Sequence, residues 1–214
     1  GVSLPKPLVK LDGEAMIDRL IRIFVANHAE SVSVIVNEEM KEVQEHLKSL
    51  SLPVPLHLVI KSTPSSMHSF FELSPSLEGG KFCLTTVDTI FKEDEFASYI
   101  KAFEQDDVHD GLMAVTDYID DEKPLYVATD PSLSVTDFMD SAYPGARYIS
   151  GGIYCLNQAG IHTLHGCMNV GVSRMRNYQR RLVEEGVQLK AYPFSKIIDV
   201  DHAEDIQKAE NFIY

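Results

Sequence analysis

The chain has 214 residues, a length typical of one α/β domain and sufficient to bury a substantial core. Its 19 basic and 32 acidic residues give a formal net charge of −13. A surface this acidic repels polyanions, which argues against nucleic acid or an anionic membrane as the main partner. No apolar run approaches the roughly 18 residues that cross a membrane. The three cysteines show no paired spacing, which indicates reduced thiols and a cytoplasmic protein.

Strands and helices alternate through the first half of the chain. Apolar residues at helical spacing predict helices around 17–24, 40–47, 67–71 and 96–103, and apolar runs predict strands at 32–36, 55–60, 81–87 and 111–116. This rhythm predicts a mostly parallel sheet with helices on both faces.

The second half has a different pattern. It predicts a hairpin over 125–138, a strand at 148–156, a helix from about 173 to 186, one further strand and a C-terminal helix from Ala203. Cys83 and Cys155 lie in apolar runs and are expected to be buried, whereas Cys167 falls in a glycine-rich connection. No repeat or linker divides the chain, so we expect one domain, 1–214.

A lysine between two prolines lies near the start, in Leu4-Pro5-Lys6-Pro7-Leu8. Proline fixes its own φ and disfavours helical backbone in the residue before it, so the pattern predicts that Lys6 sits on a stiff, non-helical arm. An ammonium with no carboxylate nearby in sequence suits a phosphate. The simpler interpretation, a proline-rich approach to the first helix, stays open.

Carboxylates follow two predicted strands. Asp88 comes directly after the strand at 81–87, and ligands of open α/β sheets bind beyond the carboxyl ends of strands. Asp199 and Asp201 lie on the same side of an extended backbone, which suits a shared Mg²⁺. The competing interpretation is that Asp88 caps the next segment and that Asp201 forms a capping box with Glu204.

The proline-flanked lysine, the Asp12-Gly13 turn and the strand at 31–36 together resemble the opening of a sugar-phosphate nucleotidyltransferase. The resemblance implies a Rossmann-like three-layer αβα sandwich with a mostly parallel mixed sheet. It also implies an NTP and a phosphorylated small-molecule acceptor as partners, with Mg²⁺ as cofactor. In that family a strand and a glycine-rich loop precede the lysine arm, so we expect such a segment to be missing from the N-terminal side of this sequence.

The resemblance also assigns roles to individual residues. Lys6, Asp88 and Asp199 would be catalytic: Lys6 would contact phosphate, and Asp88, Asp199 and Asp201 would hold the metal. One departure is that Val87 replaces the glycine that the family has before its strand-ending aspartate.

Two further segments match the family less closely. Ser62, Ser65 and Ser66 stand where the family has a turn that opens a helix beside the nucleotide base, and the N-terminus of such a helix favours phosphate. An ordinary serine-rich helix start is the alternative. Gly152 and Tyr154 resemble a strand that lines the sugar pocket, although a glycine pair can also mark a bulge.

These assignments predict transfer of a nucleotidyl group from an NTP to a sugar-1-phosphate or similar acceptor, with release of pyrophosphate. Two alternatives remain open: a glycosyltransferase that consumes a nucleotide-sugar, and a non-catalytic nucleotide-sugar sensor. The sequence leaves the nucleobase, the acceptor and the choice between a monomer and a homo-oligomer undecided.

Overall fold

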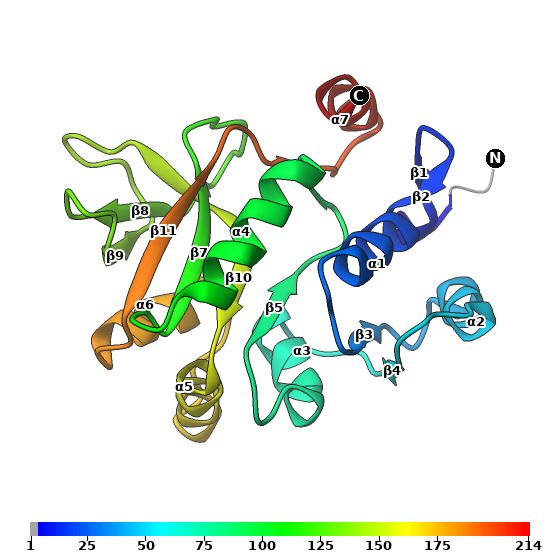
Figure 1. The fold of residues 1–214 in the computed structure, drawn as a ribbon, viewed down its shortest axis with the longest axis horizontal. Coiled ribbons are helices and arrows are strands. Elements are labelled where there is room, and N and C mark those ends of the chain that lie inside the picture. The colour runs from blue at the N-terminus through cyan, green and yellow to red at the C-terminus, as the bar shows by residue number, and fades with distance from the viewer. Residues whose placement is uncertain (1–3) are drawn as a thin grey trace.

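The computed structural model describes residues 4–214, and its strands fall into one large sheet and several short pairs (Figure 1). The large sheet has the order β11-β7-β10-β8-β9, with β5 also paired to β10. Its strands are β5 (Phe82–Thr85), β7 (Gly111–Thr116), β8 (Tyr126–Thr129), β9 (Val135–Met139), β10 (Tyr148–Leu156) and β11 (Leu189–Phe194). The short pairs are β1 (Lys10–Leu11) with β2 (Glu14–Ala15), β3 (Val32–Val36) with β4 (Leu56–Ile60), and β6 (Thr89–Ile90) with β12 (Ile198–Asp199).

Helices surround these strands on both faces (Figure 1). They are α1 (Met16–Ala26), α2 (Lys41–Ser49), α3 (Ser66–Leu73), α4 (Glu93–Gln105), α5 (Gln158–Asn169), α6 (Met175–Glu184) and α7 (Ala203–Ile213), with 3-10 turns η1 (Lys6–Leu8) and η2 (Ser74–Ser76). None of the described helices has the length and apolar character needed to span a bilayer.

The sheet is mixed, and its strand directions place several strand ends at one edge. β7 and β11 are parallel, while β10 runs antiparallel to β5, β7 and β8. β5, β7 and β11 therefore point the same way and end on the same side. The predicted α/β class with a mixed sheet is confirmed.

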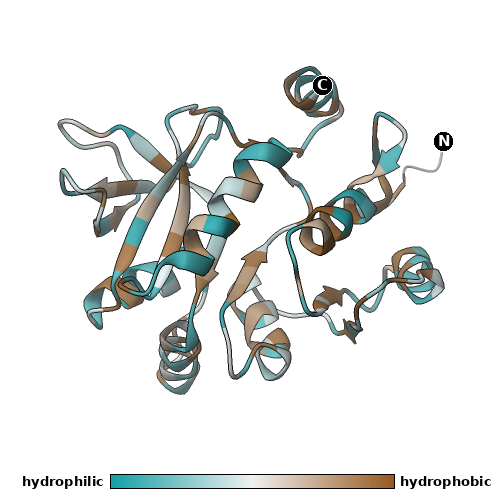
Figure 2. Ribbon diagram, in the orientation of Figure 1, coloured by the Kyte–Doolittle hydropathy of each residue, from teal (hydrophilic) through white to brown (hydrophobic). Residues whose placement is uncertain are grey.

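The core centres on β7, in which all six residues are buried. β7 pairs with β10 on one side and β11 on the other, so both of its edges are satisfied. On one face Tyr99 of α4 packs over it and donates a hydrogen bond to the Leu112 carbonyl at 2.5 Å. Figure 2 shows hydrophobic colour along β7 and its neighbours and hydrophilic colour on the outer turns of the helices.

The prediction for the region around Cys167 was wrong, because these residues form helix α5 and not a loop. Its N-terminus is capped by Asn157, whose side chain accepts a hydrogen bond from the Ala159 amide. Ile161, Leu164 and Cys167 recur at helical spacing and are buried. The glycines and histidines between them mask this stripe in the sequence.

Two smaller expectations also need correction. Lys6 lies in the 3-10 turn η1 and not on a non-helical arm, because the φ of Pro7 is compatible with a helical turn and Pro7 has no amide to leave unpaired. The turn is closed by hydrogen bonds from Leu8 N to Pro5 O (2.9 Å) and from Val9 N to Lys6 O (3.1 Å). Cys83 is only partly buried, because β5 has a partner strand on one edge only within residues 4–214.

Candidate functional site

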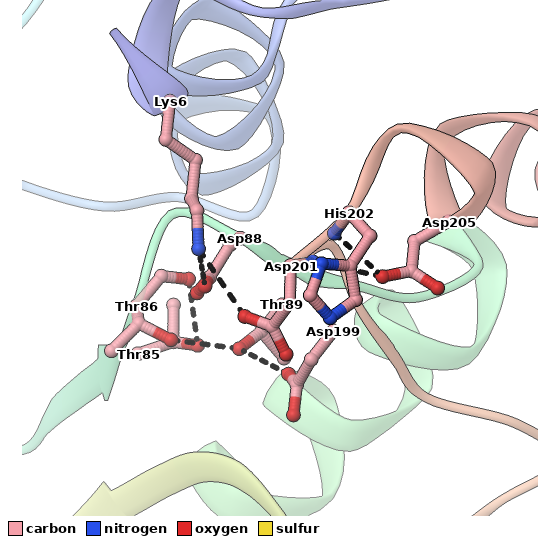
Figure 3. A network of polar contacts seen from close by, with 9 residues as sticks. All are labelled: Lys6, Thr85, Thr86, Asp88, Thr89, Asp199, Asp201, His202 and Asp205. Carbon is pink, nitrogen blue, oxygen red and sulfur yellow. Dashed lines mark hydrogen bonds and ion pairs between the residues drawn. The ribbon is translucent and has the colours of Figure 1, made fainter. Parts of the chain in front are cut away.

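The structure brings together one cation and two carboxylates that are far apart in the sequence (Figure 3). The Nζ atom of Lys6 lies 3.0 Å from Oδ2 of Asp88 and 3.2 Å from Oδ1 of Asp201. The Lys6 side chain is 41% exposed, Asp88 20% and Asp201 59%, so solvent and ligands can reach the cluster. We call these residues, together with the adjacent Asp199, the Lys6 cluster.

Backbone and hydroxyl contacts join the two loops that carry the carboxylates. β6 and β12 form an antiparallel pair in which Thr89 lies opposite Asp199. The Thr89 hydroxyl donates to Oδ1 of Asp199 at 3.4 Å and contacts the Thr86 hydroxyl at 2.8 Å. The Val200 amide donates to the Asp88 carbonyl at 2.9 Å. The segment after β5 and the segment before α7 therefore form one unit.

The cap of α7 differs from the one expected from the sequence. His202 is the N-cap residue, and Oδ2 of Asp205 accepts hydrogen bonds from the amides of His202 (2.8 Å) and Asp201 (3.0 Å). The prediction of a capping box between Asp201 and Glu204 was therefore wrong by one residue. The shift leaves the Asp201 carboxylate available to pair with Lys6.

Negative charge exceeds positive charge in the Lys6 cluster, and the pKa values of Lys6 and Asp199 are both raised. Desolvation alone would lower the pKa of Lys6, but hydrogen bonds and charge from Asp88 and Asp201 outweigh it and raise that pKa above its usual value. Although Asp199 keeps contact with solvent, desolvation and the charges of Asp88 and Asp201 raise the pKa of its carboxyl to about 6. One ammonium does not neutralise three neighbouring aspartates.

The donor atoms of the cluster fit a hard divalent cation. Carboxylate and hydroxyl oxygens are the ligands that Mg²⁺ prefers, and Mg²⁺ is often held by only one or two carboxylates plus water and substrate phosphates. Within the described residues no group of three or more His, Cys, Asp or Glu side chains is arranged to hold an ion alone. A metal at this site would therefore need oxygen ligands from a bound phosphate and water.

A cavity of about 480 Å³ opens beside the cluster. Asp199 and Asp201 lie on its wall, and Thr116 brings the end of β7 to it. The other lining residues are mostly polar or acidic and come from 118–122, 149–151, 197–198 and 202–208. The cavity thus lies beyond the carboxyl end of a buried parallel strand, where open α/β sheets bind ligands.

The three predicted nucleotide-binding serines all lie at the start of α3 or in the segment before it. Ser65 caps α3 through its contacts with His68, and Ser66 is the first residue of that helix. The Ser62 hydroxyl accepts from the Glu38 amide and donates to Glu39, both at 3.1 Å. Among residues 4–214 no hydrogen bond or ion pair links these serines to the Lys6 cluster, and their proposed role stays a prediction.

Gly152 and Tyr154, the predicted acceptor-binding residues, lie on β10. Gly152 has φ +76° at an irregularity in the β10–β7 register, and its carbonyl accepts from the Thr85 hydroxyl at 3.1 Å. Burial first, and then the charge of Asp199, raise the pKa of Tyr154 to about 12. The cavity wall includes Gly151 but neither Gly152 nor Tyr154, so their proposed role also stays a prediction.

Sequence reasoning did not identify the acidic segment after β7. Tyr118, Asp120 and Asp121 line the cavity, and Lys208 of α7 reaches Asp120 at 3.2 Å. The usable signal was the position of this segment just beyond a fully apolar strand, the same signal that identified Asp88.

Three solved structures with the same fold are a CTP transferase and two pyrophosphorylases. The inositol-1-phosphate CTP transferase from T. maritima aligns with a TM-score of 0.77 and 18% identity, over 98% of this chain and 89% of that one. UDP-glucose pyrophosphorylase in complex with UDP-glucose aligns at 0.79 and 12%, over 98% and 90%. A nucleoside-diphosphate-sugar pyrophosphorylase from Vibrio cholerae aligns at 0.70 and 13%, over 99% and 93%.

Sequence comparison adds no relative to these structures: no sequence-family model matches the chain, and no curated protein is significantly similar to it. The identities of 12–18% establish a shared fold and leave the reaction to be argued from the site. At the level of the fold, the resemblance to sugar-phosphate nucleotidyltransferases is confirmed.

Proposed function

We propose that this protein transfers a nucleotidyl group from an NTP to a small phosphorylated acceptor and releases pyrophosphate. The observation that carries the proposal is the Lys6 cluster: a lysine ammonium held between Asp88 and Asp201, next to Asp199. The shared fold with three nucleotidyl-transferring enzymes supports the same reaction class. The protein's three cysteines are free thiols, which supports a reducing compartment such as the cytoplasm.

In this reaction an oxygen of the acceptor phosphate attacks the α-phosphorus of the NTP. The bond from the α-phosphorus to the oxygen that bridges to the β-phosphorus breaks, and that oxygen leaves with pyrophosphate. No covalent intermediate on the protein is needed, so catalysis depends on positioning and on neutralising negative charge. The protein must therefore hold two phosphate-bearing molecules together against their mutual repulsion.

Lys6 would supply part of that neutralisation. An ammonium has three N–H donors, and Asp88 and Asp201 accept two of them among the described residues. The third can donate to a phosphate oxygen. The two aspartates fix the position of the ammonium, which reduces the reorganisation required when charge develops on the leaving group.

Asp88 and Asp199, with Asp201, would hold Mg²⁺, the cofactor that we propose. Bound there, the ion would neutralise phosphate charge as a Lewis acid. The raised pKa of Asp199 supports this assignment, because a carboxyl crowded by Asp88 and Asp201 gains from a neighbouring cation. We place the acceptor in the 480 Å³ cavity, whose wall includes Asp199 and Asp201.

Pyrophosphate release tests the proposal. The protein product of the complete gene would be incubated with each of the four common NTPs and dTTP, with Mg²⁺, and with sugar-1-phosphates, inositol phosphate or phosphocholine. We expect pyrophosphate and an equimolar nucleotidylated product with one base and one acceptor class. Transfer of sugar from a nucleotide-sugar, or nucleotide binding with no turnover across the panel, would contradict the proposal.

A matched pair of variants separates the site from general damage. Asp88→Asn removes a carboxylate of the Lys6 cluster, whereas Glu93→Gln removes a surface carboxylate that pairs with Arg22 at 2.8 Å. We expect loss of turnover in the first variant and turnover close to that of the unmodified protein in the second. Equal activity in both variants would exclude the Lys6 cluster as the reaction site.

A further inference from the structure

The sheet places two of the protein's three cysteines directly opposite each other. Cys83 lies on β5 and Cys155 on β10, and the antiparallel register of these neighbouring strands pairs the two residues (Figure 1). Cys83 and Cys155 are far apart in the sequence, so their spacing does not show that they meet. We call these two residues the Cys83–Cys155 pair.

Hydrogen bonds of β10 show which kind of cross-strand pair the two cysteines form. The Asn157 amide donates to the Asp110 carbonyl at 2.9 Å, and continuation of the β10–β7 register places these two residues opposite each other. Hydrogen-bonded and non-hydrogen-bonded positions alternate along an antiparallel strand pair. Cys155, two residues before Asn157, therefore directs its amide and carbonyl toward β7 and away from β5. Toward β5, Cys155 and Cys83 form a non-hydrogen-bonded pair.

This kind of pair brings opposite side chains closest together. The Cα atoms of a non-hydrogen-bonded pair are about 4.5 Å apart, and a disulfide joins Cα atoms that are about 4.4–6.8 Å apart. Both side chains lie on the sheet face under α4, where Cys155 belongs to the buried cluster that contains Phe96 and Cys83 packs against that cluster. The two sulfur atoms can therefore bond without a rearrangement of either strand.

The thiol groups also affect each other directly. Hydrogen bonding to Cys155, followed by burial, raises the pKa of the Cys83 thiol. Since the thiolate is the nucleophile in disulfide exchange, a raised pKa makes the reaction of this thiol slow at neutral pH. The pair is thus close enough to join and slow to react.

A cavity of about 590 Å³ gives access to the Cys83–Cys155 pair. Both cysteines lie on its wall, beside Phe96, Ile100 and Phe103 of α4. A volume of this size accommodates a small organic molecule. Because Cys83 is partly exposed and Cys155 is buried, a reagent that enters the cavity meets Cys83 first.

The third cysteine provides a contrast. Cys167 lies in α5 and packs in a different apolar cluster, which contains Met67 and Leu164. In the unfolded chain, however, Cys155 and Cys167 are the two cysteines nearest in sequence, and a bond between them closes the shortest loop. The fold and the unfolded chain therefore favour different disulfides.

We propose that Cys83 and Cys155 are a modification site: a dithiol that a small organic disulfide oxidises to a cross-strand disulfide. The Cys83 thiolate attacks one sulfur of the reagent, whose S–S bond breaks and releases one small thiol. The Cys155 thiolate then attacks the Cys83 sulfur of the mixed disulfide and releases the second small thiol. The two protein thiols lose two electrons and two protons, and the reagent gains them.

The proposed site would respond to the redox state of its compartment. A reducing thiol pool keeps both cysteines as thiols, and a pool that becomes oxidising links β5 to β10 covalently. This inference does not depend on the proposed function.

Peptide mapping after oxidation tests the proposal. The folded protein would be incubated for hours with hydroxyethyl disulfide, treated with N-ethylmaleimide and digested. We expect a cross-linked peptide pair that contains Cys83 and Cys155, with a single maleimide label on Cys167. The cross-link should exceed the mixed disulfide at Cys83 at least about tenfold, because the fold holds Cys155 against it. Three maleimide labels, a mixed disulfide that persists at Cys83, or a cross-link that includes Cys167 would overturn the proposal.

Two variants and an unfolded sample provide the controls. Cys167→Ser should form the cross-link as the unmodified protein does, and Cys155→Ser should stop at the mixed disulfide on Cys83. In concentrated guanidinium chloride, the same treatment should favour the link between Cys155 and Cys167. If Cys155→Ser does not fold, the maps of the unmodified protein and of Cys167→Ser decide the matter. Loss of the cross-link in folded Cys167→Ser, or the same cross-links in folded and unfolded protein, would refute selection of this pair by the fold.

Discussion

Two clusters of charged side chains illustrate the difference between a structural ion pair and a candidate site. Arg22 of α1 contacts Glu14 through two hydrogen bonds of 2.9 Å and contacts Glu93 at 2.8 and 3.2 Å. Arg19 lies nearby, so two arginines face two glutamates and charge is balanced. The Lys6 cluster instead places one ammonium among three aspartates.

The side chains of Arg22 and Lys6 also differ in how they bind their partners. The planar guanidinium of Arg22 is held by fixed, paired hydrogen bonds, whereas the ammonium of Lys6 is a point charge with a donor to spare. A charge-balanced cluster has little affinity for another ion. The excess of negative charge around Lys6 favours binding of a cation, and that cation can in turn bind the oxygens of a phosphate. Charge balance, more than the number of contacts, distinguishes the two clusters.

The largest effect is expected from Asp88→Asn. Loss of this carboxylate removes the strongest fixed partner of Lys6 and one proposed metal ligand, so we expect kcat/KM for pyrophosphate release to fall about 1,000-fold. Circular dichroism and thermal melting should show a folded protein. A fall of less than about tenfold in a folded variant would remove Asp88 from the mechanism.

A somewhat smaller loss is expected from Lys6→Met, which keeps an unbranched side chain that is one atom shorter but deletes its charge. We expect kcat to fall about 100-fold, because the charge offsets developing negative charge in the transition state. The NTP concentration dependence of initial rates would separate kcat from KM. A change confined to KM would mean that Lys6 only binds substrate.

The third expected effect concerns stability and its pH dependence. The pKa of Asp199 is raised to about 6 in the folded protein, above an unfolded value near 3.9, so the folded state prefers the protonated carboxyl. The stability gained from this protonation is complete below about pH 4 and is lost as the pH rises through 6. At pH 7.5 the charged carboxylate therefore destabilises the folded state.

Asp199→Asn should consequently be more stable than the unmodified protein at pH 7.5, by about 1 kcal/mol or roughly 2–4 °C once solvent contact is taken into account. The difference should shrink at pH 4. Thermal melts at both pH values, without divalent ions, provide the measurement. If the melting temperature of Asp199→Asn exceeds that of the unmodified protein by more at pH 4 than at pH 7.5, the pKa of Asp199 is not raised in the folded state and this interpretation is wrong.

The smallest effect is expected from Arg22→Gln in the balanced cluster. Exposed ion pairs contribute about 1 kcal/mol or less, so the melting temperature should fall by only a few degrees. Turnover should stay within about twofold of the unmodified protein, since no contact joins Arg22 to the Lys6 cluster within residues 4–214. A loss of turnover comparable to that of Lys6→Met would show that charge balance does not separate the two clusters.

The sequence predicted well those features that depend on neighbouring residues. The strands at 32–36, 111–116 and 148–156 have the expected bounds, because their apolar runs end at clear turn signals. Asp88 could be singled out because it follows such a run. Helix α5 was missed because glycines and histidines interrupt its buried stripe.

Features that depend on distant residues could not be predicted from local patterns. From the sequence, either Glu204 or Asp205 could cap α7. The structure has Asp205 as the capping residue, and Asp201 forms an ion pair with Lys6, 195 positions away in the sequence. Likewise, the apolar run of β5 shows that it is a strand but not that one of its edges lacks a partner. The pairing of elements, unlike their type, is decided by tertiary contacts.

The wide sequence separation of Lys6 and Asp201 determines when the Lys6 cluster can form during synthesis of the chain. Because Lys6 and Asp201 come from opposite ends of the described chain, a nascent polypeptide on the ribosome cannot assemble the Lys6 cluster until translation has passed residue 201. A product that terminates early, for example after β11, lacks Asp199 and Asp201. Nascent and prematurely terminated chains would therefore lack the complete Lys6 cluster and, under the function proposed above, could not transfer a nucleotidyl group.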